Sequence, residues 1–293
     1  MVDNRTNPYT DVWYSSDDGL RLYARRYACT GRARATILCM HGLTRNSADF
    51  AELCESLQDQ YELIVADQRG RGLSAYDSTV TNYQPARYVK DMVTLLEELS
   101  IDQVILIGTS MGGLMAMAMG AAQPERFIGI VLNDIGPQVD PAGLQRIMSY
   151  AGKVPEVHNW DEAAAQAKAT NGIAFPDYTN ENWLHFAHRL YVVNDKGQPQ
   201  LAYDPAIADA IEKSDTAAVP VDLWPVFSAL SAIPTLIVRG ATSDILAADC
   251  VARMLGVHSL CEAVEVSGRG HAPMLDEPKA AAAINGFLTR ITH

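Results

Sequence analysis

Short runs of β-branched and other apolar residues alternate with amphipathic stretches over most of this chain. The apolar runs are typical of buried strands and occupy residues 35–40, 63–66, 104–107, 128–132, 234–238 and 261–266. Between them, apolar residues recur every three or four positions, which predicts helices over 47–58, 85–99, 113–122, 250–255 and 278–291. Strands that alternate with helices predict an α/β fold, in which a mostly parallel sheet has helices on both faces.

Two segments depart from this alternation. Apolar residues at 12–14 and 20–27 flank Asp18-Gly19, which predicts an antiparallel hairpin at the start of the sheet. After about residue 137 the strand pattern disappears, and helices are predicted at 142–150, 161–170, 182–192 and 205–214. We therefore expect a core domain made of residues 1–136 and 226–293, with a helical cap domain of residues 137–225 inserted into it.

The predicted cap is rich in aromatic residues, namely Trp160, Phe175, Tyr178, Trp183, Phe186 and Tyr191. Most of them should pack between the helices of the cap itself, because large rings supply the apolar area that a small layer needs. A few of them should face a cleft between the cap and the core.

Charge and composition exclude several classes of partner. The 293 residues are 48% hydrophobic and 20% charged, and the net charge of −12 argues against nucleic acid, against anionic membranes and, mildly, against polyanionic substrates. The five cysteines lack metal-ligand spacing and should be reduced and buried. We therefore expect that the protein binds no metal. No apolar run is long enough to span a membrane, and the N-terminus has no leader pattern, so we expect a cytoplasmic protein.

The strongest chemical signal is Ser110, which lies between Gly108 and Gly112. The strand predicted before it and the helix predicted after it make this Gly-x-Ser-x-Gly pattern a nucleophile elbow. The two glycines leave room for a tight turn that exposes the serine hydroxyl. The start of the following helix then favours the negative charge that develops during attack on a carbonyl.

A serine hydroxyl needs a base, and the base needs an acid to orient it. His271 follows the last predicted strand in a Gly-Arg-Gly-His loop and is the expected base. Asp244, at the end of the preceding strand, is the expected acid, since the order Ser, Asp, His is usual for this elbow. Asp134 ends another strand and is the alternative acid that could reach the same imidazole.

Two backbone amides should form the oxyanion hole. One is the N–H of Met111, directly after the nucleophile, and the other is the N–H of Leu43, in the turn after the strand that ends at Met40. His41 should brace that turn. The charged segment 67–74 lacks the Gly-Lys-Ser/Thr ending of a phosphate loop and is interpreted as a structural turn, and His185 with His188 lacks a third metal ligand.

The chain resembles the α/β-hydrolase superfamily over almost its whole length. The matching motifs are Met-His-Gly-Leu-Thr at 40–44, Asp-x-Arg-Gly-x-Gly-x-Ser at 67–74, Gly-Thr-Ser-Met-Gly-Gly at 108–113, the strand end at Asp244 and the loop at His271. The resemblance implies a Ser-His-Asp hydrolase that needs no cofactor and has a helical cap over its site. Dehalogenases and epoxide hydrolases of the superfamily carry aspartate at the elbow, so a serine there argues against both.

From these features we expect an enzyme that cleaves a small, largely apolar carboxylic ester or lactone. Ser110 would attack the carbonyl and form an acyl-serine. One alternative is the hydrolysis of a carbon–carbon bond in ring-cleavage-type products by the same triad. Another, of a different class, is a ligand receptor that retains the triad. The oligomeric state is left open.

Overall fold

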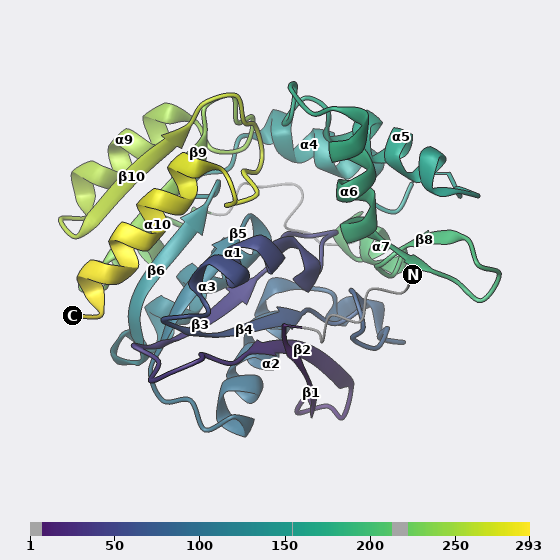
Figure 1. The fold of residues 1–293 in the computed structure, drawn as a ribbon. Helices are drawn as coiled ribbons and strands as arrows, with labels where there is room; N and C mark the ends of the chain where they lie inside the picture. The colour runs from purple at the N-terminus through teal and green to yellow at the C-terminus, as the bar shows by residue number, and fades with distance from the viewer. Residues whose placement is uncertain (1–7, 154, 213–221) are drawn as a thin grey trace.

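A single sheet forms the centre of the molecule. A computed structural model describes residues 8–153, 155–212 and 222–293. The sheet has the strand order β1-β2-β4-β3-β5-β6-β9-β10; β2 runs antiparallel to both of its neighbours, and the strands from β4 to β10 are parallel (Figure 1). The strands are β1 (Thr10–Ser15), β2 (Arg21–Tyr27), β3 (Thr36–Met40), β4 (Glu62–Asp67), β5 (Val104–Thr109), β6 (Phe127–Asn133), β9 (Thr235–Gly240) and β10 (Cys261–Val266).

Helices cover both faces of the sheet, as the alternating pattern predicts. The α-helices of the core are α1 (Ala51–Leu57), α2 (Pro85–Glu98), α3 (Met111–Ala122), α8 (Trp224–Ser228), α9 (Ala248–Val257) and α10 (Pro278–Ile291). Leu53 of α1 and Phe287 of α10 belong to one apolar core, and Met92 of α2 belongs to the other. Ile105 and Leu106 of β5 enter opposite cores, because successive side chains of a strand point to opposite faces.

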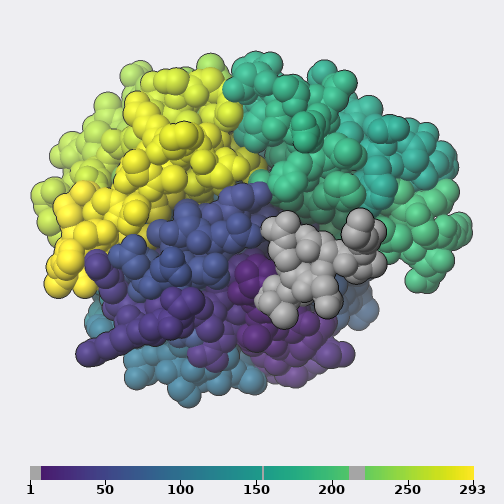
Figure 2. All heavy atoms as spheres, in the orientation of Figure 1, coloured from purple at the N-terminus to yellow at the C-terminus, as the bar shows by residue number. Residues whose placement is uncertain are grey.

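The described residues between β6 and α8 form a layer beside the sheet, coloured teal to green in Figures 1 and 2. Its helices are α4 (Pro141–Tyr150), α5 (Trp160–Asn171), α6 (Asn180–Leu190) and α7 (Ala206–Glu212). Phe175, Trp183 and Phe186 contact one another within an apolar cluster of this layer, which we call the cap. Most cap aromatics therefore pack among themselves, as expected, whereas the domain boundaries at 137 and 225 stay a prediction.

The cap also contains strands, which the sequence analysis did not predict. β7 (Tyr191–Val193) and β8 (Pro199–Leu201) form a short antiparallel pair. The helix predicted at 182–192 ends at Leu190 instead, because two β-branched valines and a turn with Gly197 at a φ of 77° favour a hairpin. The end of the helix predicted at 205–214 lies outside the described residues, as does the N-terminal segment 1–7.

None of the helices in the described ranges is at once long enough and apolar enough to cross a lipid bilayer.

Candidate active site

Ser110 lies in a sharp turn between β5 and α3. Its φ of 53° and ψ of −116° are strained for a residue with a Cβ. A Cβ at Gly108 would lie 2.3 Å from the carbonyl oxygen of Gly112, and a Cβ at Gly112 would lie 2.0 Å from that of Met40. Both positions therefore require glycine, and the turn has the geometry of a nucleophile elbow.

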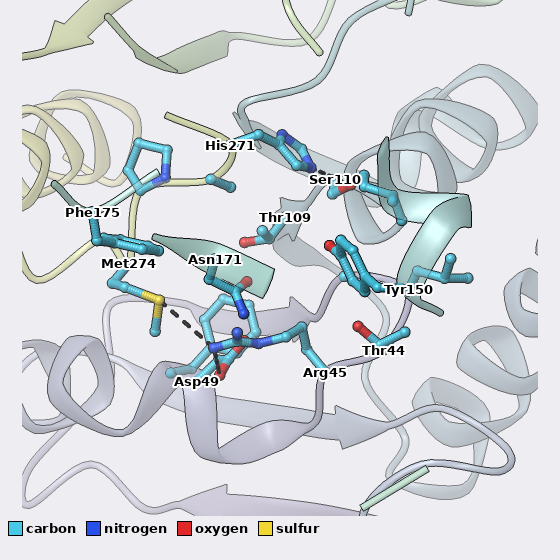
Figure 3. A pocket seen from close by; sticks show the side chains of 16 residues that line it. Thr44, Arg45, Asp49, Thr109, Ser110, Tyr150, Asn171, Phe175, His271 and Met274 are labelled. Carbon is cyan, nitrogen blue, oxygen red and sulfur yellow. Dashed lines mark hydrogen bonds and ion pairs between the residues drawn. The ribbon is translucent and has the colours of Figure 1, made fainter. Parts of the chain in front are cut away.

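The imidazole of His271 lies between the serine and a carboxylate. Its Nε2 is 2.9 Å from Ser110 Oγ, an interaction drawn in Figure 3, and its Nδ1 is 2.8 Å from Asp134 Oδ2. Because a carboxylate only accepts hydrogen bonds, Nδ1–H donates to Asp134 and Nε2 is left to accept from the serine hydroxyl. The ends of β5 and β6 and the loop after β10 thus bring together three side chains that are far apart in the sequence.

The carboxylate of Asp134 is fully buried and receives two further hydrogen bonds. Gly240 N–H donates to Oδ1 at 2.8 Å, and the Ser243 hydroxyl donates to Oδ2 at 2.6 Å. Both donors belong to β9 or the loop that follows it. They compensate the carboxylate for its lost hydration and hold it in one orientation toward the imidazole.

Asp244, the acid predicted from chain order, is paired with the cap instead of the imidazole. Arg146 of α4 donates from Nε to Oδ2 at 2.5 Å and from Nη2 to Oδ1 at 3.0 Å. Partial burial raises the pKa of Asp244, but the hydrogen bonds from Arg146 outweigh it and leave the pKa below its ordinary value. The placement of Asp244 on the imidazole is therefore wrong, and Asp134, the alternative acid, occupies that position.

Two residues that support this arrangement were missed at the level of sequence. Ser243 is one of them, and its only signal was that it lies in the loop that carries Asp244. Asn133 is the other: its Nδ2 donates to Thr109 Oγ1 at 3.0 Å and to the carbonyl oxygen of Pro273 at 2.8 Å. Asn133 therefore ties the turn before the serine to the loop that carries the histidine, and its only signal was that it precedes Asp134.

The turn after β3 orients the peptide between Gly42 and Leu43. His41 Nδ1–H donates to the Gly42 carbonyl at 2.7 Å, while His41 Nε2 accepts from Gln68 N–H at 3.0 Å. Burial lowers the pKa of His41 to about 4, so the imidazole stays neutral and keeps both roles. Because a trans peptide is planar, fixing this carbonyl turns the Leu43 N–H to the opposite side. His41 braces the turn, as the sequence analysis expects.

The amide of Met111 is the first of α3. Two and three residues further along the helix, the amides of Gly113 and Leu114 donate to the carbonyl of Ser110 at 2.9 Å and 3.1 Å. The first N–H groups of a helix have no acceptor within the helix and can serve a ligand. The use of the Leu43 and Met111 amides as an oxyanion hole stays a prediction that this backbone geometry favours.

A cavity of about 70 Å³ opens above Ser110 and His271. Figure 3 shows polar side chains among those that line it, including Thr44, Arg45, Asp49, Tyr150 and Asn171. The sequence analysis expects a largely apolar substrate, and the lining mixes these polar groups with apolar ones such as Phe175 and Met274. Leu43 lines the cavity, whereas the side chain of Met111 is buried in the core.

The other polar groups considered in the sequence analysis make structural contacts. His185 lies 3.0 Å from Glu52, and the ring of His188 lies 3.8 Å from that of Trp160. In the 67–74 turn, the buried guanidinium of Arg69 bonds both carboxylate oxygens of Asp91 at 2.7 Å. Over the part of the chain that the structure describes, no three His, Cys, Asp or Glu side chains converge as metal ligands.

Comparisons with known proteins agree with this architecture. Residues 35–278 match the family model described as the alpha/beta hydrolase fold. The crystal structure of an alpha/beta hydrolase from Novosphingobium aromaticivorans is 40% identical, with a TM-score of 0.92, over 97% of this chain and 99% of that one.

Two curated relatives are also similar over most of their length. The 3-hydroxybutyrate-oligomer hydrolase of Cupriavidus necator is 34% identical over 86% of this chain and 88% of its own. The 2-(acetamidomethylene)succinate hydrolase of Mesorhizobium japonicum is 28% identical over 80% of this chain and 81% of its own.

Proposed function

Because this chain belongs to the α/β-hydrolase family, we propose that it is a serine hydrolase that cleaves a small carboxylic ester or lactone through an acyl-serine intermediate. The observation that carries the proposal is the continuous set of hydrogen bonds from Ser110 through His271 to Asp134. A curated relative named for 3-hydroxybutyrate oligomers supports it, since hydroxy acid units are joined through ester bonds.

In the first half of the reaction, Ser110 Oγ attacks the substrate carbonyl while His271 Nε2 takes its proton. Asp134 accepts from Nδ1–H, keeps Nε2 free for this proton, and stabilises the imidazolium that forms. The amides of Leu43 and Met111 donate to the oxyanion, and loss of one such donor typically costs about 3 kcal/mol. The imidazolium then protonates the leaving alkoxide, which leaves an acyl-serine and an alcohol.

In the second half, water enters on the side that the alcohol has left. His271 takes a proton from this water, the hydroxide attacks the acyl carbon, and the proton returns to Ser110. Activity should fall on acidification, because a protonated imidazole cannot accept the serine proton. No step of this proposed reaction uses a metal ion.

The Ser110→Ala variant tests the proposal. Its turnover of short p-nitrophenyl esters should fall at least about 10³-fold, since the nucleophile is removed. Mass spectrometry of the unaltered enzyme, quenched during turnover, should find the acyl group on Ser110. Turnover that survives in Ser110→Ala would contradict the proposal, and turnover without an acyl-enzyme would favour direct attack by water, as in carbon–carbon bond hydrolysis.

A further inference from the structure

Arg45 places a cationic group in the cavity that contains the nucleophile. It comes from the turn between β3 and α1, and it is the only arginine or lysine among the described residues that line this cavity. A Cβ built at Gly42 would lie 3.6 Å from Arg45 Cγ and 3.6 Å from Ser110 Cβ, so both side chains flank the same glycine. Figure 3 shows Arg45 and Asp49 across the pocket from Ser110 and His271.

The guanidinium of Arg45 is held in a fixed orientation. Its Nε and Nη2 donate to the two oxygens of Asp49 at 2.7 Å and 2.6 Å. Its Cζ lies over the ring of Phe186 in the cap, 4.3 Å from the ring centroid, and Nη2 also lies 3.8 Å from Met274 Sδ. Because these contacts already order the Arg45 side chain, that side chain loses less conformational entropy when a ligand binds to it.

One end of the guanidinium remains available. Among the described residues, Nη1 donates to no protein acceptor, although the side chain is only 14% exposed. Arg45, Thr44 and Tyr150 also line a second cavity of about 30 Å³, which extends beneath the cap. Arg45 therefore lies where the space above the nucleophile adjoins the space under the cap, with the two N–H groups of Nη1 unused.

From this arrangement we propose that Arg45 binds a carboxylate carried by the substrate, so that the enzyme acts on esters that bear one negative charge. This inference rests on the proposed function and names the substrate class of the same site. The planar fork of arginine matches carboxylate geometry, and N–H groups of a cation make the stronger class of hydrogen bond. The Thr44 hydroxyl lies beside Arg45 in the pocket and supplies a further donor (Figure 3).

Asp49 limits the charge that the site accepts. It neutralises part of the charge of Arg45, so recognition depends on directed N–H donors and favours one carboxylate over a polyanion. The net charge of −12 acts in the same direction, because it repels highly charged anions from the surface. A substrate carboxylate would extend the Asp49–Arg45 pair, with the guanidinium between two acids.

Binding to the Ser110→Ala variant tests this inference without turnover. Two matched pairs serve as ligands: monoethyl glutarate with ethyl pentanoate, and 4-acetoxybutanoate with butyl acetate. In each pair a carboxylate is replaced by a methyl group, on the acyl side or on the alcohol side. Calorimetry should show tighter binding of the carboxylate in at least one pair, and adding Arg45→Gln should weaken that binding about 10- to 100-fold while changing the neutral partner less than about threefold.

Two further variants in the Ser110→Ala background separate recognition from folding. Arg146→Gln removes a nearby arginine that lines neither cavity and should leave the preference for the carboxylate unchanged. Asp49→Asn removes the competing acid and should strengthen that preference. Equal binding of charged and neutral partners, or the same preference with and without Arg45→Gln, would overturn the inference. The proposed function fails separately, if the Ser110 enzyme hydrolyses none of the four esters.

Discussion

The turns that follow β6 and β9 each carry an aspartate near the active site, but the two carboxylates differ in their surroundings. Asp134 is fully buried, contacts His271, and receives hydrogen bonds from the neighbouring β9 segment. Asp244 is 30% exposed and contacts Arg146 of the cap. The β6 turn thus supplies the carboxylate that contacts His271, while β9 and the loop after it supply the donors that hold this carboxylate in place.

This comparison shows that a strand end is not enough to make a carboxylate part of a triad. A buried carboxylate needs donors for both oxygens, and Gly240 and Ser243 provide them for Asp134. An exposed carboxylate can instead pair with whichever cation a neighbouring layer presents. Asp244 pairs with α4, the helix whose Ile147 and Tyr150 line the cavity, so its contact connects the cap to the core.

The largest effect should come from Asp134→Asn. The amide cannot stabilise the imidazolium of His271 and favours the wrong tautomer, so kcat should fall about 10³- to 10⁴-fold. Steady-state kinetics on a short p-nitrophenyl ester would measure this, with Asp244→Asn as the matched control. A larger loss of kcat in Asp244→Asn than in Asp134→Asn would contradict the assignment of these two carboxylates.

A smaller effect should come from Ser243→Ala. Asp134 Oδ2 would lose its hydroxyl donor, and a hydrogen bond to a charged group contributes about 1.5–3 kcal/mol, so kcat should fall about 10- to 150-fold. Ser243→Thr keeps a hydroxyl and should restore most of the activity. Equal losses in Ser243→Ala and Ser243→Thr would show that the hydroxyl does not support the acid.

Asp244→Asn should change kcat less than about threefold, because Asp244 bonds Arg146, whereas His271 bonds Asp134. Its main effect should be on the free energy of unfolding, and this should be at most about 1 kcal/mol, since the ion pair with Arg146 is partly exposed to solvent. Urea unfolding at neutral pH would measure the loss.

The smallest expected effect is the pH dependence of the stability that Asp244→Asn removes. The pKa of Asp244 is lowered in the folded protein, so its contribution to stability is complete above the ordinary carboxyl pKa and disappears as the pH falls through the lowered value. The unfolding free energies of the original protein and Asp244→Asn should therefore differ at neutral pH and converge in acid. A difference that persists in acid would assign the stabilisation to something other than the charge of Asp244.

Much of the site was predictable because it depends on local chain geometry. The turn around Ser110 requires glycine at two fixed positions, and apolar strand patterns place its neighbours in a sheet. His271 follows a strand in a loop with glycines on either side of Arg269. The hairpin of β7 and β8 was not predictable with the same rules, because a helical stripe and a short strand overlap around Tyr191.

The sequence by itself determined the α/β fold, the serine at its elbow and the glycine-rich loop that carries His271, since each is recognised from residues close together in the chain. Only the tertiary structure decided between the two acids. Arg146 meets Asp244 across 98 residues, and Ser243 meets Asp134 across 109. The choice depends on which donors surround each carboxylate after folding, and no local pattern records those partners.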